Sequence, residues 1–183
     1  MVIDRAESAS EEGRAASPPE DLARRAGRLK LVLTDCDGVL TDAGVYYSAR
    51  GEEMKRFSIR DGMGIERLRN AGIATAIVTG ENAKMVLRRS EKLGIKAHLG
   101  VKDKGGRLAE ILAFHGVSGD EVAYIGDDVN DLSAMEKIRE AGLVGCPFDA
   151  MPEVRRRAHF VTRASGGHGA FREFAEWLLG ARG

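Results

Sequence analysis

The sequence contains two groups of aspartates, and each group directly follows a short apolar stretch, 29–34 or 122–125. The groups are Asp35 and Asp37, and Asp127, Asp128 and Asp131. Asp-Gly and Asp-Asp pairs are common in turns and helix caps, so one group alone would indicate little. If both stretches are neighbouring strands, the carboxylates converge on one crevice and their repulsion must be neutralised. A hard divalent cation with oxygen ligands does this, and Mg²⁺ is the usual cytoplasmic choice.

Two further polar features occupy similar positions. The apolar stretch 73–78 ends at Thr79-Gly80, where a hydroxyl and free backbone N–H groups suit a bound anion, although ordinary helix capping uses the same residues. Lys104 opens a predicted helix, and its alternative interpretation is an exposed surface lysine. Together with the aspartates, these residues predict a phosphoryl-transfer site: a carboxylate nucleophile, a second carboxylate as acid and base, donors for phosphate oxygens, and metal-binding acids.

The elements that must position these residues are short apolar strands that alternate with helical patterns. The predicted strands are 29–34, 73–78, 97–99, 122–125, 143–144 and 160–161, and the predicted helices are 61–71, 82–93, 103–114, 128–141 and 169–179. This alternation predicts an α/β fold with a mainly parallel sheet and helices on both faces. Two further stretches, 45–47 and 55–59, flank a turn and predict a β-hairpin insertion at about 44–58. Ligands of such sheets bind beyond the carboxyl ends of the strands, where the polar residues lie.

The chain length of 183 residues corresponds to one domain. Residues 1–27 contain no aromatic residue and include Pro18-Pro19, so we predict a mobile N-terminal extension with a short helix from Pro19 as an option. Residues 28–183 are the predicted single domain.

The composition excludes several classes of partner. The 28 basic and 28 acidic side chains cancel, which argues against a general nucleic-acid binder. No apolar run approaches the roughly 18 residues of a membrane-spanning helix. The two cysteines, Cys36 and Cys146, provide no disulfide framework, so we expect a cytoplasmic protein.

Four motifs occur over roughly residues 30–180, in the order Asp-x-Asp, Thr-Gly, Lys and Gly-Asp-Asp-x-x-Asp. This order resembles that of the four motifs of the haloacid dehalogenase-like phosphatases, which have a Rossmann-like fold. The resemblance implies that Asp35 is the nucleophile and forms an aspartyl-phosphate, and that Asp37 is the acid and base. It implies that Thr79 and Lys104 hold the phosphate. It also implies that Mg²⁺ is bound by Asp35, the Asp37 backbone carbonyl and Asp127. Asp128 and Asp131 would lie around these ligands and hold them in place.

A narrower resemblance rests on DCDGVLTDAGVYYSARGEEMKRFSIRDGMGI, residues 35–65, and VTRASGGHGAFRE, residues 161–173. These stretches look like the small capless phosphatases of 2-keto-3-deoxy sugar-acid phosphates. That group includes octulosonate 8-phosphate phosphatases, nonulosonate (sialic-acid-type) 9-phosphate phosphatases, and phosphatase-like domains attached to acylneuraminate cytidylyltransferases. The resemblance implies a homotetramer in which the hairpin packs at the centre and a neighbouring subunit closes each active site.

Five residues are candidates for substrate binding: Gly80, Glu81, Arg60, Lys92 and His168. The octulosonate group usually has Arg where this chain has Glu81, and Glu81 with Lys92 is similar to the nonulosonate branch. The alternative is an ordinary first-turn Glu and an exposed Lys. His168 stands where the octulosonate group usually has Arg, and it pairs with a carboxylate only when protonated. Arg60 is either a substrate contact or half of a surface ion pair.

The leading interpretation is therefore a Mg²⁺-dependent octulosonate-type phosphatase. The alternatives are a nonulosonate 9-phosphate phosphatase and a non-catalytic domain, although no motif residue is missing. Asp37 argues against a dehalogenase, because protonating an alkoxide leaving group is a phosphatase requirement.

Overall fold

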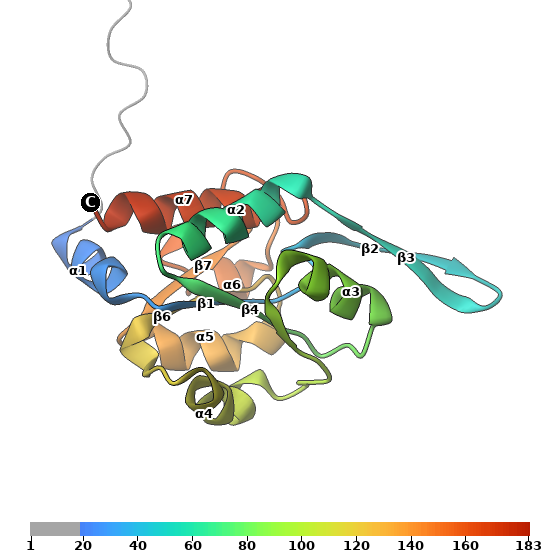
Figure 1. Ribbon diagram of the computed structural model, residues 1–183, viewed down its shortest axis with the longest axis horizontal. Helices are drawn as coiled ribbons and strands as arrows, with labels where there is room; N and C mark the ends of the chain where they lie inside the picture. Colours follow the sequence, from blue (N-terminus) through green and yellow to red (C-terminus); the bar gives the residue numbers. More distant parts are fainter. Residues whose placement is uncertain (1–18) are drawn as a thin grey trace, which may run out of the picture.

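The computed structural model describes residues 19–183, and the part of the predicted extension before Pro19 lies outside the described residues. Six parallel strands form one sheet (Figure 1). In spatial order they are β5 (Lys96–His98), β4 (Ala74–Val78), β1 (Leu31–Thr34), β6 (Val122–Ile125), β7 (Leu143–Cys146) and β8 (Phe160–Val161). The expected mainly parallel α/β sheet is confirmed.

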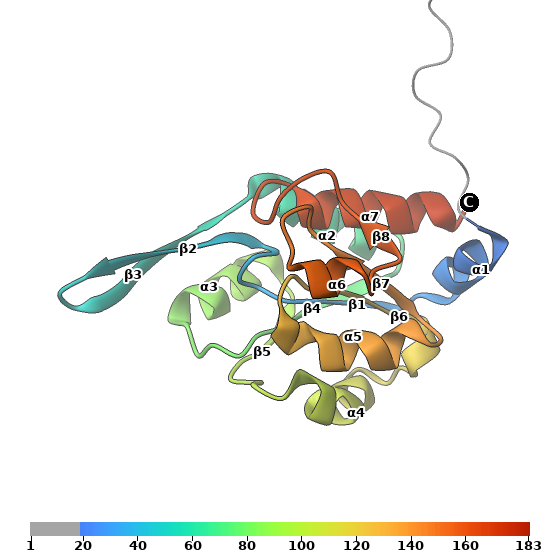
Figure 2. The same ribbon diagram turned by 180° about the vertical axis from the view of Figure 1, so that it is seen from behind.

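Within residues 19–183, seven α-helices surround this sheet. They are α1 (Glu20–Arg28), α2 (Ile59–Asn70), α3 (Lys84–Leu93), α4 (Lys104–His115), α5 (Leu132–Arg139), α6 (Pro152–Arg155) and α7 (Ala170–Ala181). Figure 1 shows α2 and α7 on one face and α4 and α5 on the other. On the first face, β8 lies next to α7 (Figure 2), where the Phe160 and Trp177 rings stack with centroids 4.7 Å apart. No helix among residues 19–183 is both long enough and apolar enough to cross a membrane.

The central strand β1 is covered on both faces, which explains its continuous run of apolar residues. Val32 packs into the core between the sheet and α1, α2 and α7. Leu31 and Leu33 pack into the opposite core, which includes residues of α4 and α5. Successive strand residues point to opposite faces, so a strand covered on both faces must be apolar at every position.

The predicted hairpin is present and projects from the body as β2 (Thr41–Ser48) and β3 (Gly51–Phe57) (Figure 1). Its second strand ends earlier than predicted, because Ser58 caps α2 by accepting a hydrogen bond from the Arg60 N–H. Ile59 is consequently the first residue of the helix and not part of a strand.

The short helix that was an option from Pro19 is present as α1, and it packs on the body: Ala26 is fully buried, and Arg25 donates to the Arg139 and Gly142 carbonyls. Two predicted helix starts are wrong for identifiable reasons. The predicted helix 82–93 begins at Lys84, because backbone hydrogen bonds hold the preceding turn, Thr79–Glu81, to β5 and to the loop that follows it. The predicted helix 128–141 is a 3₁₀ turn, Val129–Asp131, followed by α5.

Candidate active site

The polar residues after three neighbouring strands meet at one edge of the sheet. In the register of the sheet, Thr34 at the end of β1 lies level with Ile77 of β4 and Ile125 of β6. A cavity of about 210 Å³ opens at this edge. The predicted residues that line it are Asp35, Asp37, Asp127 and Asp128 after β1 and β6, and Thr79, Gly80 and Glu81 after β4. The convergence expected from the parallel sheet is therefore present.

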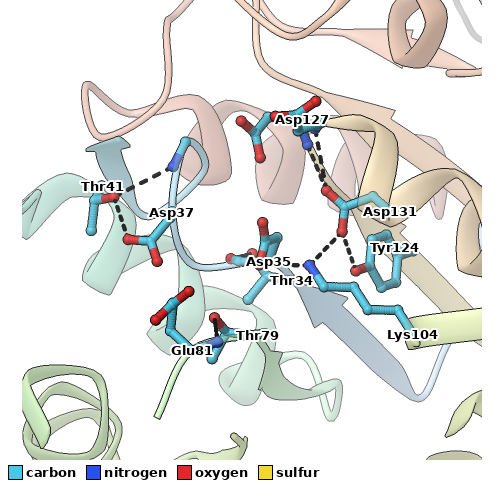
Figure 3. Close-up of polar contacts among 12 residues, drawn as sticks. Thr34, Asp35, Asp37, Thr41, Thr79, Glu81, Lys104, Tyr124, Asp127 and Asp131 are labelled. Atoms are coloured by element: carbon cyan, nitrogen blue, oxygen red, sulfur yellow. Dashed lines mark hydrogen bonds and ion pairs between the residues drawn. The ribbon is translucent and has the colours of Figure 1, made fainter. Parts of the chain in front are cut away.

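Lys104 lies beneath the cavity between two carboxylates (Figure 3). Its Nζ is 2.7 Å from Asp35 Oδ1 and 2.6 Å from Asp131 Oδ1. The side chain is completely buried although Lys104 is the first residue of α4, so the alternative of an exposed surface lysine is wrong. A buried ammonium group is tolerable only with such paired carboxylates.

Asp131 organises this network but has little capacity left for another ligand. Its Oδ1 accepts from Lys104 and from the Tyr124 hydroxyl, at 2.6 Å each, and its Oδ2 accepts from the Asp127 N–H at 3.0 Å and the Asp128 N–H at 3.4 Å. These four bonds match the four lone-pair positions of a carboxylate. Asp131 is therefore suited to hold its neighbours in place.

Three clustered carboxylates, those of Asp35, Asp127 and Asp131, share the single ammonium group of Lys104, which leaves an excess of negative charge at this site. Burial, followed by the charge of Asp131, raises the pKa of Asp35 to about 7 against the opposing effect of Lys104. Burial and the charges of Asp35 and Asp131 raise the pKa of Asp127 to about 8. Asp127 Oδ1 is buried and has no hydrogen-bond partner in residues 19–183.

A divalent cation fits this site. Oxygens of Asp35, Asp127 and Asp131 all lie within 4.8 Å of one another. Because Asp131 already accepts four hydrogen bonds, Asp35 and Asp127 are the carboxylates free to bind a metal. An oxygen-only donor set that includes an unpartnered buried oxygen suits Mg²⁺.

Asp37 lies at the mouth of the cavity, with 27% of its side chain exposed. Its Oδ2 is 2.8 Å from Lys55 Nζ, and its Oδ1 accepts from the Thr41 hydroxyl at 3.2 Å. Lys55 was not predicted as a site residue, because it stands in a run of charged residues on the hairpin that shows no motif spacing. Ala43 and Asn130 also line the cavity and were not predicted.

Thr79 is buried, and its hydroxyl oxygen accepts the Glu81 N–H at 3.2 Å (Figure 3). The backbone N–H of Thr79 donates to the His98 carbonyl of the edge strand. The hydroxyl therefore organises a tight turn and keeps its own proton to donate towards the cavity. It does not cap α3, whose N-cap residue is Ala83.

Three predicted substrate-binding residues do not line the cavity of this chain. Arg60 is exposed in the first turn of α2, and Lys92 is exposed in the last turn of α3. The ring of His168 lies with Nδ1 2.8 Å from the Gly166 carbonyl and Nε2 3.3 Å from Arg56. Both ring nitrogens are thus occupied by contacts within the chain.

Two glycines allow the loops of the site to pack together. Gly38 has φ +86°, and a Cβ there would lie 1.9 Å from Asp127 Oδ2. A Cβ on Gly166 would lie 1.9 Å from the Gly38 carbonyl oxygen. The Gly-Gly-His-Gly tail therefore packs directly on the loop after β1, a contact that only glycine permits.

Comparisons with known proteins agree with this geometry. The model of the haloacid dehalogenase-like hydrolase family matches residues 60–139. The 3-deoxy-D-manno-octulosonate 8-phosphate phosphatase KdsC of Yersinia pestis is 41% identical over 162 residues, which cover 87% of this chain and 84% of that protein. The KdsC enzyme of Escherichia coli K12 is 41% identical over 89% of this chain and 86% of its own length.

A solved structure extends the likeness to the fold. The 3-deoxy-D-manno-octulosonate 8-phosphate phosphatase of Moraxella catarrhalis, in complex with magnesium, phosphate and KDO, matches with a TM-score of 0.82 and 36% identity. The match covers 88% of this chain and 92% of that one. From the extent of these matches, the chain belongs to the haloacid dehalogenase-like hydrolases as a phosphatase related to the KdsC enzymes.

Proposed function

We propose that this phosphatase hydrolyses 3-deoxy-D-manno-octulosonate 8-phosphate with Mg²⁺ and through an aspartyl-phosphate on Asp35. The observation that carries the reaction is the position of Asp35, whose Oδ1 is bound to buried Lys104 beside the unpartnered Asp127 carboxylate. The substrate is supported by the relatives, whose names state that activity at 41% identity over most of the chain.

In the first step, the free carboxylate oxygen of Asp35 attacks phosphorus, the Asp35–phosphorus bond forms, and the bond to the sugar oxygen breaks. Asp37 gives its proton to the departing alkoxide. Lys104 and the Thr79 hydroxyl donate to the phosphoryl oxygens and stabilise the charge that they carry. Asp35, Asp127 and the Asp37 backbone carbonyl would hold Mg²⁺, which when bound screens the repulsion between carboxylate and phosphate.

In the second step, Asp37 acts as the base. It takes a proton from a water molecule, which attacks phosphorus and displaces Asp35 as a free carboxylate. Inorganic phosphate leaves, and Asp37 is protonated for the next turnover. Asp131 takes no proton in this scheme, because all four of its acceptor positions are occupied.

A second substrate has one specific observation in its favour. Glu81 lines the cavity at the position where the octulosonate group usually has Arg. A carboxylate accepts hydrogen bonds from sugar hydroxyls, whereas an Arg can only donate them, so the two residues select different arrangements of substrate groups. A nonulosonate 9-phosphate is therefore the second candidate.

Oligomeric state and location also remain proposals. The hairpin exposes Tyr46 (59%), Tyr47 (71%) and Met54 (59%), which supports a homotetramer in which these side chains are covered. Cytoplasmic localisation remains a prediction from the cysteine count.

The test measures phosphate release from octulosonate 8-phosphate, a nonulosonate 9-phosphate and hexose phosphates, with Mg²⁺ and with a chelator. We expect the highest kcat/KM for octulosonate 8-phosphate and no turnover in chelator. Asp35→Asn should abolish turnover, while Asp120→Asn, at the opposite end of β6, should not. Turnover by Asp35→Asn would refute the mechanism, and a higher kcat/KM for the nonulosonate would reassign the substrate.

A further inference from the structure

The strand β3 delivers a buried lysine to the active site. Its burial pattern alternates between exposed and half-buried residues, as expected for a projecting hairpin. Lys55 is one of the half-buried residues of this pattern, and only 1% of its side chain is exposed because its Nζ points to the active site, 2.8 Å from Asp37 Oδ2. By contrast, Arg50 in the ion pair with Glu53 on the same hairpin is 84% exposed. Exposed pairs of that kind contribute little, whereas a pair with one buried partner holds the two side chains in a defined geometry.

The carboxylate of Asp37 is held entirely by hairpin residues. Lys55 binds Oδ2, and the Thr41 hydroxyl donates to Oδ1 at 3.2 Å. Thr41 is the first residue of β2, and Lys55 pairs with Val45 across the hairpin. No side chain of the central sheet or of α2–α7 forms a hydrogen bond to this carboxylate in the described residues. The orientation of Asp37 therefore depends on the placement of the hairpin.

The base of the hairpin is itself fixed to the body by the next residue. Successive strand residues point to opposite faces, so Arg56 points away from Asp37. It donates to the Gly167 carbonyl at 3.0 Å and lies 3.5 Å from Asp42 Oδ2. Lys55 thus lies on a strand that is hydrogen-bonded to the loop that contains Gly167. This bond fixes the position of the backbone from which the Lys55 side chain reaches Asp37.

We propose that Lys55 is a positioning residue that holds the Asp37 carboxylate in the orientation from which Asp37 transfers protons. This inference rests on the proposed function, in which Asp37 is the acid and base. It does not give Lys55 a contact with the phosphate or the metal. The hairpin, which projects from the body, thereby contributes to the catalytic arrangement.

The test is a double-mutant cycle with Lys55→Met and Asp37→Asn, measured as kcat and KM on the sugar-acid phosphate with saturating Mg²⁺. General acid–base catalysis is worth about 10²–10⁴-fold, so Asp37→Asn retains measurable turnover at high enzyme concentration. We expect Lys55→Met to lower kcat by about tenfold to a hundredfold, as expected for a lost hydrogen bond to a charged group, with KM within about twofold. In the Asp37→Asn background the same substitution should change kcat by less than about twofold.

Controls separate the possible failures. The control variant is Lys30→Met, which removes a lysine that also forms an ion pair, in this case with Glu121. Lys30 precedes β1 and lies at the edge of the sheet opposite to the active site, so the substitution should leave kcat unchanged. If Lys55→Met does not fold, Lys55→Gln, which keeps a hydrogen-bond donor, replaces it in the cycle. An equal loss from the Lys55 substitution in both backgrounds, or no loss in either, overturns the inference. Unchanged kcat in Asp37→Asn instead overturns the proposed function.

Discussion

Replacing Asp127 by asparagine should stabilise the metal-free protein. Burial and repulsion by Asp35 and Asp131 raise the pKa of Asp127 from 3.8 to about 8. A change of this size corresponds to about 6 kcal/mol between the two protonation states. The carboxylate borders an open cavity where water screens part of the charge, so we expect Asp127→Asn to raise the free energy of unfolding by about 2 to 4 kcal/mol at pH 9.

The direction of the pH dependence follows from the raised pKa. The folded state keeps the Asp127 proton to higher pH than the unfolded state, so the wild-type protein loses stability as the pH rises from about 4 through about 8. Asp127→Asn lacks that loss. The difference between variant and wild type should therefore be smallest at pH 5 and largest at pH 9.

Urea unfolding in the presence of a chelator, at pH 5 and pH 9, measures this difference. The matched control is Asp128→Asn, which removes one charge from the exposed neighbour and keeps its helix-capping oxygen. Added Mg²⁺ at a hundredfold excess over its Kd should stabilise the wild type by about 2.7 kcal/mol and Asp127→Asn much less. The reasoning is wrong if Asp127→Asn is no more stable than wild type at pH 9 in chelator.

Three further substitutions test the packing and the network. Gly166→Ala places a Cβ 1.9 Å from a backbone carbonyl of the loop after β1 and should lower the unfolding free energy by about 2 to 4 kcal/mol, whereas Gly180→Ala, which meets open space, should not. Burial and two nearby arginines lower the pKa of His159 to about 4, so the wild type loses stability as the pH falls from about 6.5 to about 4. His159→Gln should lose about 1 to 2 kcal/mol less unfolding free energy than the wild type over this pH range, because solvent screens part of the effect at a half-buried ring. Urea unfolding at a series of acidic pH values measures this difference. Tyr124→Phe deletes the 2.6 Å hydrogen bond to Asp131 and should cost about 1 to 2 kcal/mol in urea unfolding, with a loss in kcat of less than about tenfold.

The main lines of the fold could be predicted from the chain because they depend on local patterns. The apolar run of β1 and the matching runs that became β4 and β6 required a sheet covered on both faces. Parallel strands end at one edge, so Asp35, Thr79 and Asp127 come together once β1, β4 and β6 are neighbours, whatever the order of the outer strands. The motif spacing then identified the family before any contact was known.

The helix starts and the extension could not be predicted in the same way. Nothing local requires α1 to pack on the body, since its anchoring bonds run from Arg25 to carbonyls more than a hundred residues away. The start of α5 depends on Asp131, whose side chain accepts hydrogen bonds from the backbone N–H groups of Asp127 and Asp128. These bonds stabilise the 3₁₀ turn that precedes the helix. These are contacts between segments, and local propensity carries no information on them.

The sequence by itself determined the type of fold and the residues that carry the chemistry, because strand periodicity and motif order are local properties of the chain. Only the tertiary structure decided which of those residues bear unneutralised charge. It also showed that Lys104 is buried, that Asp131 is saturated with hydrogen bonds, and that Lys55 on a distant hairpin holds Asp37. Burial and pairing depend on the register of the sheet and on how the hairpin base packs against the body, which are settled only when the whole chain folds.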